Sequence, residues 1–355
     1  MRGILGNNRG VALILVLLMM SVIVAVTLQI NVASRAQIYE VSNLGDGIKA
    51  IYIAKSGIFG AVMILANDKN AYDGLDEEWA NLEPLTEKSK SLFDGGYLQL
   101  SIVDESGKIQ VNRLADGDQY NNEVKDLLTR LLGLPEYNLS TKEVSDLLDA
   151  IKDWLDPDSE VTGGGAENAF YASLPEPYAC KNGPLDSLEE LLKVHGMTRE
   201  LFYGRKDQPG IGTCLTMEGS GKININTAPR QVLRALAPGI TEEAAEEMDL
   251  FRKKERDRLS DPLWYKNVGS MATITINSNL LSVRSEVFSV TSTGVIGTLN
   301  RAISGMVERD GSGKIKILSW KGRWTLRKKK LFAGRDRMTS LSRKAESEKI
   351  LWRPW

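Results

Sequence analysis

The chain has 355 residues, enough for two modest domains or for one domain that carries a large insertion. Its 45 basic and 46 acidic residues give a formal net charge of −1, which does not indicate a polyanionic partner. A single histidine excludes a histidine-rich metal site, and no third residue orients it toward a cysteine as a nucleophile pair.

The first predicted element is an apolar helix over residues 11–30. Residues 1–10 hold two arginines and no acid, and residues 11–30 hold no charge. Twenty helical residues span about 30 Å, the thickness of the hydrocarbon core of a bilayer. A cleaved secretory signal, cut near Val32-Ala33-Ser34, is the alternative, but its apolar region is typically only about 7 to 15 residues long. The sequence therefore predicts a retained transmembrane helix, with the N-terminus in the cytoplasm and the bulk of the chain exported.

Beyond the membrane segment, apolar residues recur every three or four positions from Ile38 to Leu65. This spacing is typical of a helix with one apolar face. We therefore expect residues 31–68 to continue the helix outside the membrane.

Strand patterns lie on both sides of a long helical block. Residues 92–112 read as two strands joined by a tight turn, and strand character returns over 276–320. The block between them, residues 113–275, is predicted to be helical. The fold class is therefore α+β: a long N-terminal helix packs on an antiparallel sheet, and a large all-α domain is inserted in that sheet.

Capping patterns mark the helices of the block. Ser140 with Glu143, and Ser187 with Glu190, match the capping box, and Thr227 is the expected N-cap of a third helix.

An acidic, glycine-rich loop, DPDSEVTGGGAEN, follows the first of these helices at residues 156–168. Aligned with the EF-hand pattern, Asp156, Asp158, Glu160 and Glu167 fall at positions 1, 3, 5 and 12. Converging carboxylates repel one another unless a cation lies among them, and calcium accepts six to eight oxygens in flexible geometry. These four residues are the predicted calcium ligands.

Two positions depart from that pattern: Pro157 stands at the second, and Val161 replaces the glycine of the sixth. We therefore expect a calcium loop with its own shape. Two other interpretations stay open, a solvated acidic turn and the paired carboxylates of a hydrolase, although neither a substrate groove nor a second acidic cluster is evident.

The two cysteines, Cys180 and Cys214, also leave two interpretations open. They are enough for one disulfide in an exported chain, and they are equally compatible with two unrelated buried thiols.

Residues 225–248 resemble helix-hairpin-helix segments that hold DNA phosphates with backbone amides. A nucleic-acid-binding membrane protein is therefore the alternative function. However, four glutamates follow the turn and would repel phosphate, so we expect a packing module and no nucleic-acid partner.

The last segment, residues 321–355, is strongly basic, with twelve Lys or Arg and three Asp or Glu. We expect a solvated, disordered extension. Docking of this tail on anionic lipid or on an acidic partner is the alternative.

The N-terminus resembles that of the type IV pilin superfamily. A basic leader ends in Gly10, an apolar helix begins at Val11, and an amphipathic continuation follows. The resemblance implies that a prepilin peptidase cuts after Gly10 and methylates the new amino terminus at Val11. Most members have Glu at the fifth mature position, where this sequence has Leu15. Since that acid pairs with the amine of a neighbouring subunit, its absence suits a subunit at a filament tip.

Five stretches resemble, in order, the minor pseudopilins called general secretion pathway protein K of type II secretion systems. They extend over most of residues 9–310 and read RGVALILVLL, DESGKIQVN, LLDAIKDWLDPDSE, GAENAFYASLPEPYACKNGPLDSLEELLKVHGMTRELF and KININTAPRQVLRAL.

This resemblance implies a pilin-like fold with an inserted helical domain that binds calcium, and no catalytic role. Such proteins span the bacterial inner membrane once, with their bulk in the periplasm. They form a tip complex with the minor pseudopilins I and J, and they start or cap a short filament on an inner-membrane assembly platform. That filament drives folded exoproteins through an outer-membrane secretin.

Overall fold

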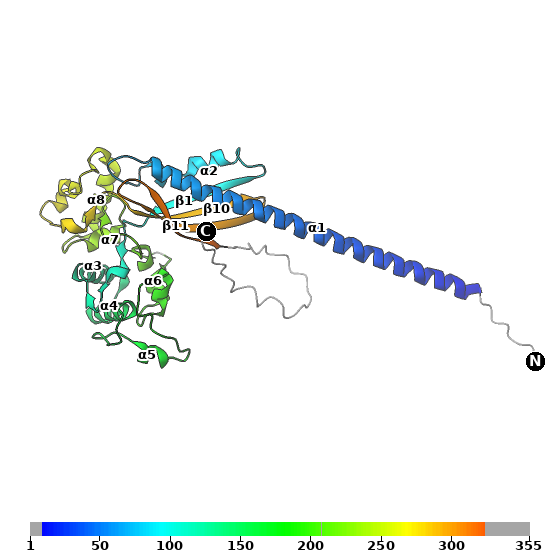
Figure 1. The fold of residues 1–355 in the computed structure, drawn as a ribbon, viewed down its shortest axis with the longest axis horizontal. Coiled ribbons are helices and arrows are strands. Elements are labelled where there is room, and N and C mark those ends of the chain that lie inside the picture. Colours follow the sequence, from blue (N-terminus) through cyan, green and yellow to red (C-terminus); the bar gives the residue numbers. More distant parts are fainter. Residues whose placement is uncertain (1–8, 207, 324–355) are drawn as a thin grey trace, which may run out of the picture.

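The structure is a computed structural model that describes residues 9–206 and 208–323 (Figure 1). Most of the predicted leader, residues 1–10, lies outside the described residues, as does the basic tail from residue 324 onward. The tail prediction began too early, because residues 321–323 still belong to the last strand, β12 (Ile315–Arg323).

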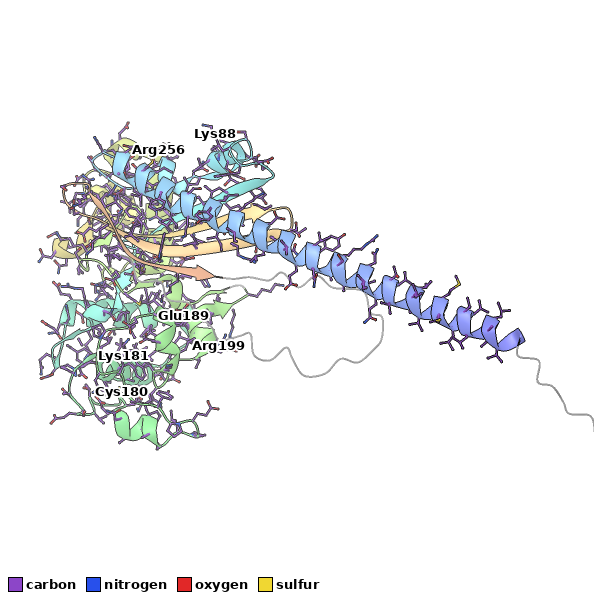
Figure 2. The ribbon with its side chains drawn as sticks, turned by 45° about the vertical axis from the view of Figure 1, so that its right-hand side comes forward. Lys88, Cys180, Lys181, Glu189, Arg199 and Arg256 are labelled. Carbon is purple, nitrogen blue, oxygen red and sulfur yellow. The ribbon has the colours of Figure 1, made fainter. Side chains whose placement is uncertain are left out.

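The first element is a single helix of 59 residues, α1 (Arg9–Asn67), which confirms the long N-terminal helix. Residues 10–45 are exposed throughout, and their side chains stand free of the rest of the molecule (Figure 2). By length and composition α1 has the properties of a membrane-spanning helix.

The last part of α1 packs closely on the sheet through small residues. Ala50, Ala54 and Ala61 are fully buried. A Cβ atom at Gly57 would overlap the side chains of the sheet, and one at Gly294 would overlap the backbone of α1 at Ala50. The backbone of the helix therefore approaches the sheet closely, and larger side chains at these positions would prevent this approach.

The sheet has four antiparallel strands in the order β1 (Gly96–Asp104), β10 (Val287–Ile296), β11 (Leu299–Arg309) and β12. Leu98, Leu100 and Ile102 alternate toward the buried face, as predicted, and lie in one core with Phe288 and Val290. A short helix, α2 (Glu83–Ser89), packs beside β1. One face of the sheet is thus covered by α1, as in other antiparallel sheets with a single buried face.

The chain leaves the sheet after β1 and returns at β10, so residues 105–286 form the insertion. The predicted limits, 113 and 275, fall inside these. Figure 1 shows the insertion gathered at the end of the sheet away from the N-terminus. Among the described residues it contains the helices α3 (Asn122–Leu132), α4 (Thr141–Leu155), α5 (Asn168–Ala172), α6 (Arg199–Tyr203), α7 (Arg230–Ala235) and α8 (Glu242–Lys254).

Short elements complete the fold. The 3-10 helices are η1 (Glu78–Ala80), η2 (Val111–Arg113), η3 (Pro135–Tyr137), η4 (Leu188–Lys193), η5 (Ile211–Thr213), η6 (Arg256–Arg258), η7 (Trp264–Asn267), η8 (Gly269–Met271) and η9 (Ser278–Leu280). Two-residue strands pair as β2 (Ile109–Gln110) with β7 (Leu215–Thr216), β3 (Ala115–Asp116) with β4 (Gln119–Tyr120), β5 (Gly204–Arg205) with β6 (Gln208–Pro209), and β8 (Ile223–Asn224) with β9 (Leu281–Ser282). The inserted domain is therefore mainly helical and not purely α.

The predicted hairpin over 92–112 is wrong in its second strand. Residues 109–110 pair in parallel with 215–216, inside the insertion, while β1 pairs along its length with β10. The sheet edge that the hairpin would have used is thus taken by a strand nearly 200 residues later in the chain.

A buried polar network joins the sheet to the insertion. Asp104, at the end of β1, accepts hydrogen bonds from Ser106 N (2.7 Å), Ser285 Oγ (2.5 Å), Asn224 Nδ2 (3.4 Å) and the Thr227 hydroxyl. Burial raises the pKa of Asp104, although these donors oppose the shift. Thr227 is therefore part of this network and not the predicted helix cap.

The other predicted caps have mixed outcomes. Ser140 and Glu143 form the capping box of α4. Ser187 caps nothing among the described residues, because its hydroxyl contacts Glu189 and the following turn is the 3-10 helix η4.

Candidate metal centre

The acidic loop folds back on the helix that precedes it. Asp146, Asp149 and Asp153 lie at three- and four-residue spacing on α4 and so share one face. Cβ atoms at glycines 163–165 would overlap the carboxylates of these three residues. The three glycines are therefore required because the loop backbone lies directly against an acidic helix face.

Three carboxylates converge where α4 meets this loop. Oxygens of Asp153, Asp156 and Glu167 all lie within 4.8 Å of one another. Asp153 and Asp156 are 0% exposed and Glu167 is 2% exposed. We call these three residues the acidic centre.

The hydrogen bonding of the acidic centre is incomplete. Asp153 accepts from Thr162 N at 3.1 Å, and Glu167 Oε2 accepts from Asn168 N at 3.2 Å. Asp156 Oδ1 and Glu167 Oε1 are buried, and neither has a hydrogen-bond partner among the described residues. Leaving a buried carboxylate oxygen without a hydrogen-bond partner destabilises the fold by on the order of 1–3 kcal/mol or more.

Burial raises the pKa of all three carboxyl groups, and repulsion from neighbouring carboxylates adds to the shift. A divalent cation would satisfy the free oxygens and restore the ionised forms. Carboxylate oxygens are the donors that calcium prefers, so the residues present fit a calcium ion.

One cation already lies beside the centre. Lys152 is 5% exposed, and its ammonium binds Asp156 Oδ2 and, at 3.0 Å, Thr162 Oγ1. It neutralises one of the three negative charges.

The structure brings together two of the four predicted ligands, Asp156 and Glu167. Asp158 is half-buried and accepts a hydrogen bond from Glu160 N at 2.7 Å, while the Glu160 side chain is exposed. Neither belongs to the acidic centre.

Sequence reasoning missed Asp153. It precedes the first position of the EF-hand pattern by three residues, so the template excluded it. The available signal was the i, i+3 spacing with Asp156, which places both on one side of the last helical turn. Asn182 was also missed: its side chain donates to the backbone carbonyl of Asp158 from a segment beyond the loop.

The cysteines are free and buried, so the disulfide interpretation is not supported. Cys180 lies near the acidic centre, with Sγ 3.4 Å from the carbonyl oxygen of Asp153, whereas Cys214 contacts Thr213. Figure 2 shows Cys180 in the inserted domain, on the side away from α1. Burial raises the pKa of the Cys180 thiol to about 11, so this cysteine is not an activated nucleophile.

A second group of acids lies near the end of α1 and differs from the acidic centre. Asp68 and Asp73 both accept from the guanidinium of Arg309, with Asp68 at 2.9 Å. Glu77 accepts from Trp79 Nε1 at 2.8 Å. These carboxylates already have partners and require no metal ion.

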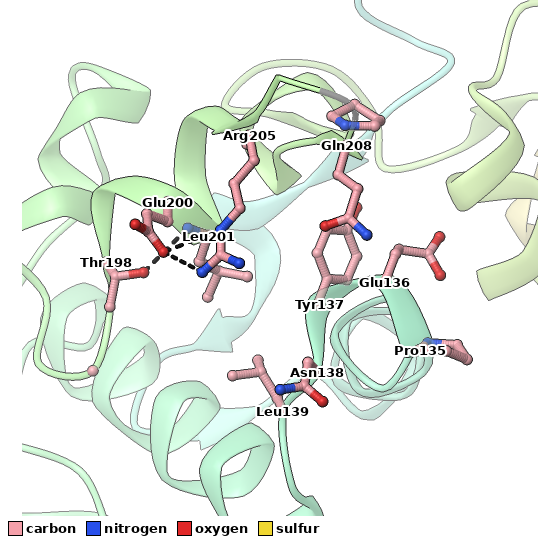
Figure 3. Close-up of a pocket in the computed structure, with 13 residues that line it drawn as sticks. Pro135, Glu136, Tyr137, Asn138, Leu139, Thr198, Glu200, Leu201, Arg205 and Gln208 are labelled. Atoms are coloured by element: carbon pink, nitrogen blue, oxygen red, sulfur yellow. Dashed lines mark hydrogen bonds and ion pairs between the residues drawn. The ribbon is translucent and has the colours of Figure 1, made fainter.

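A cavity of about 430 Å³ lies between residues 135–139 and the segment from Gly196 to Pro209 (Figure 3). Its charged groups are already paired: Glu200 with Arg205, and Glu136 with Arg234 at 2.8 Å. It presents no catalytic set of side chains in the part of the chain that the structure describes.

The helix-hairpin-helix-like segment forms α7 and α8. Arg230 binds Asp249 at 3.1 Å, and Arg234 binds Glu242 at 2.5 Å. Since both arginines are used in internal ion pairs and the first turn of α8 is acidic, the segment does not suit phosphate. It is a packing module, as expected.

Comparisons with solved structures support the fold. The chain is similar to a chain of the crystal structure of the GspK-GspI-GspJ complex from the enterotoxigenic Escherichia coli type 2 secretion system, with a TM-score of 0.55. The match covers 82% of this chain and 99% of that chain, at 18% sequence identity.

The curated relatives that the chain matches are also proteins of type II secretion systems. The type II secretion system protein K of Aeromonas hydrophila is 27% identical over 205 residues, which cover 54% of this chain and 60% of that protein. The protein of the same name from Pectobacterium carotovorum subsp. carotovorum is 32% identical over 139 residues, 38% of this chain and 41% of that protein. The matched segments thus span less than two thirds of these relatives.

Two family models match successive parts of the insertion, residues 107–204 and residues 223–284, and both are described as type II secretion system protein K. Together with the fold and the relatives, they support assignment of the chain to the type II secretion system protein K family.

Proposed function

We propose that this chain is a minor pseudopilin at the tip of a type II secretion pseudopilus, where it starts or caps the filament that drives folded exoproteins through the outer-membrane secretin. It is held in the bacterial inner membrane by residues 11–30, with its N-terminus in the cytoplasm and its bulk in the periplasm. Its role is structural and not catalytic.

The observation that carries the proposal is the division of α1 into two parts. Residues 11–30 are uncharged and expose apolar side chains on all sides, whereas from Ala50 onward one face of the helix is buried against the sheet. Exposed apolar area is unfavourable in water by about 25 cal/mol per Å². The free half therefore requires lipid and, once in a filament, the helices of neighbouring subunits.

The placement of the insertion supports a tip position. Residues 105–286 lie at the end of the sheet remote from the N-terminus of α1 (Figure 1). Subunits of a filament pack their N-terminal helices side by side, so a subunit stacked above this one would collide with the insertion. Leu15, in place of an acid that pairs with a neighbour ahead, agrees with a subunit that has none.

The proposed tip position also indicates which proteins the chain assembles with. The similar solved chain belongs to a complex of GspK with GspI and GspJ. We infer that the present chain assembles with the corresponding minor pseudopilins I and J, on the inner-membrane assembly platform, after a prepilin peptidase has cut between Gly10 and Val11.

Calcium is the proposed ligand of the acidic centre. Asp153, Asp156 and Glu167 would hold it, and the ion would supply the positive charge that their free oxygens lack. Its role is structural, because it would fix the loop to α4.

Co-expression tests the proposal. The full chain is produced with a prepilin peptidase and with tagged proteins I and J, and the membrane fraction is purified on the tag. We expect the chain to co-purify, with an intact mass that corresponds to loss of residues 1–10 and one added methyl group. A chain that is processed but never co-purifies would refute the tip complex, and a chain that is not processed would refute the pseudopilin assignment.

A further inference from the structure

We propose that Lys152 is an internal counter-ion of the acidic centre, which holds the loop in place without metal and lowers the calcium affinity by competing for Asp156. This inference rests on the calcium site of the proposed function. It assigns a role to a residue that is not a metal ligand.

The position of Lys152 carries the first step. It lies one helical turn before Asp156 on α4, and only 5% of its surface is exposed. Its ammonium binds Asp156 Oδ2, and the other oxygen of the same carboxylate, Oδ1, is one of the two buried oxygens that lack a partner among the described residues. Lysine and calcium would therefore share one carboxylate.

The charges carry the second step. When all three carboxylates are ionised, they and the one ammonium carry two net negative charges in a buried group of four side chains. This excess matches a divalent ion, but the ion would lie close to a like charge that water does not screen. Calcium must therefore displace the ammonium from Asp156 or bind beside it against repulsion, and either event weakens binding.

The contact with Thr162 carries the third step. Lys152 Nζ donates to Thr162 Oγ1 at 3.0 Å, and the backbone N–H of Thr162 donates to Asp153 at 3.1 Å. Lys152 thus ties the middle of the loop to the helix without any metal. A domain built in this way folds before it meets calcium and is tightened by calcium afterwards.

A purely supporting role for Lys152 predicts the opposite effect. If the ammonium only aimed Asp156 toward the metal, its removal would weaken calcium binding. The sign of the change in affinity therefore separates the two roles.

The test uses the full chain in detergent micelles, stripped of metal with EGTA and titrated calorimetrically with calcium chloride. Lys152→Met removes the buried ammonium and keeps the apolar stem. Lys142→Met is the matched control, because Lys142 also pairs with an acid four residues later on α4, Asp146 at 2.5 Å, but its side chain is 81% exposed. We expect calcium to bind Lys152→Met about tenfold more tightly than the parent chain, and Lys142→Met to change by about twofold or less, because exposed charges are screened.

Equal or weaker binding by Lys152→Met, with a parent chain that binds calcium, overturns the role of Lys152 and leaves the calcium site standing. Binding by Lys152→Met but not by the parent chain supports the competition and refutes calcium as the natural ligand. If neither binds, both proposals fail.

A thermal measurement keeps the test decisive if metal-free Lys152→Met is too unstable for calorimetric titration but still shows a thermal transition. The rise in Tm on adding calcium should then be larger for this variant than for the parent chain, because the variant has lost the only counter-ion that the described residues supply at Asp156. An equal or smaller rise contradicts the inference.

Discussion

Asp156 and Glu167 each combine burial with one oxygen that has no hydrogen-bond partner, whereas no other buried carboxylate among the described residues has such an oxygen. Asp104, which is also buried, accepts from four donors of the surrounding protein. Asp73 is held by Arg309. Burial alone therefore does not mark a cation site, and the free oxygens of Asp156 and Glu167 are what distinguish the acidic centre.

The ligand assignment predicts different effects of two neutralising substitutions. Asp153→Asn should weaken calcium binding by about 100-fold, equivalent to about 3 kcal/mol, because it removes a buried charge from the centre. Glu160→Gln should change it by about threefold or less, since that side chain is exposed. Calorimetric titration of both variants checks this, and similar losses in the two would favour the EF-hand alignment over the observed cluster.

The pH dependence of stability should reveal Glu77. Burial raises its pKa to about 7 from an ordinary value of 4.5, against hydrogen bonds from Gly74 N and Trp79 Nε1 that lower it. Because the folded state holds the proton more tightly, this residue favours folding below about pH 4.5, and its contribution is lost as the pH rises to about 7.

The matching experiment compares the parent chain with Glu77→Gln by urea unfolding at several pH values. Relative to the variant, the parent chain should lose on the order of 1–2 kcal/mol of unfolding free energy between pH 4.5 and 7. A difference that stays constant or grows over this range would contradict the assignment.

At the scale of elements, the contact between α1 and the sheet depends on small residues. Gly294 lies under the backbone of Ala50, so Gly294→Val must push the helix away from β10 and should destabilise the fold by about 3 kcal/mol. Gly60, which lies on α1, is the control, because a Cβ atom at this position would meet nothing within 4 Å. Gly60→Ala should stabilise by up to about 1 kcal/mol through helix propensity.

Urea unfolding of the full chain in mild detergent, followed by tryptophan fluorescence, measures both changes. Trp79 packs edge-on against Phe288 of β10 at 5.3 Å and so reports on this contact. If Gly294→Val were as stable as the parent chain, α1 would not rest on the sheet as described.

The elements also show what the sequence can and cannot predict. The alternation of Leu98, Leu100 and Ile102 predicted β1 correctly, because alternate side chains of a strand face the core and are therefore apolar. The partner of residues 109–110 was not predictable from local pattern, since it lies about a hundred residues further along the chain. Thr227 has the spacing of a helix cap, but a buried acid of the sheet, Asp104, takes its hydroxyl instead.

The same distinction applies to the acidic centre. The loop motif located Asp156 and Glu167, which flank the glycines, but its fixed spacing excluded Asp153 and included Asp158 and Glu160. Only the path of the loop back onto α4 determines which carboxylates converge. The role of Lys152 depends on that same path: the i, i+4 spacing with Asp156 can be seen in the sequence, but the contact with Thr162 and the burial cannot.

At the scale of the whole molecule, the proposed function depends on two surfaces at opposite ends of the chain. In the proposed filament, the free half of α1 would contact lipid and neighbouring helices, and the insertion would occupy the space of a further subunit (Figure 1). Together these surfaces would allow lateral assembly below and none above.

A density map of the assembly tests this central claim most directly. The processed chain, co-purified with proteins I and J in lipid nanodiscs, is imaged by cryo-electron microscopy. The account predicts that the α1 helices lie side by side and that residues 105–286 project beyond the partners at the end remote from the bilayer. A map in which another subunit sits above the insertion, or in which α1 makes no contact with partner helices, would contradict it.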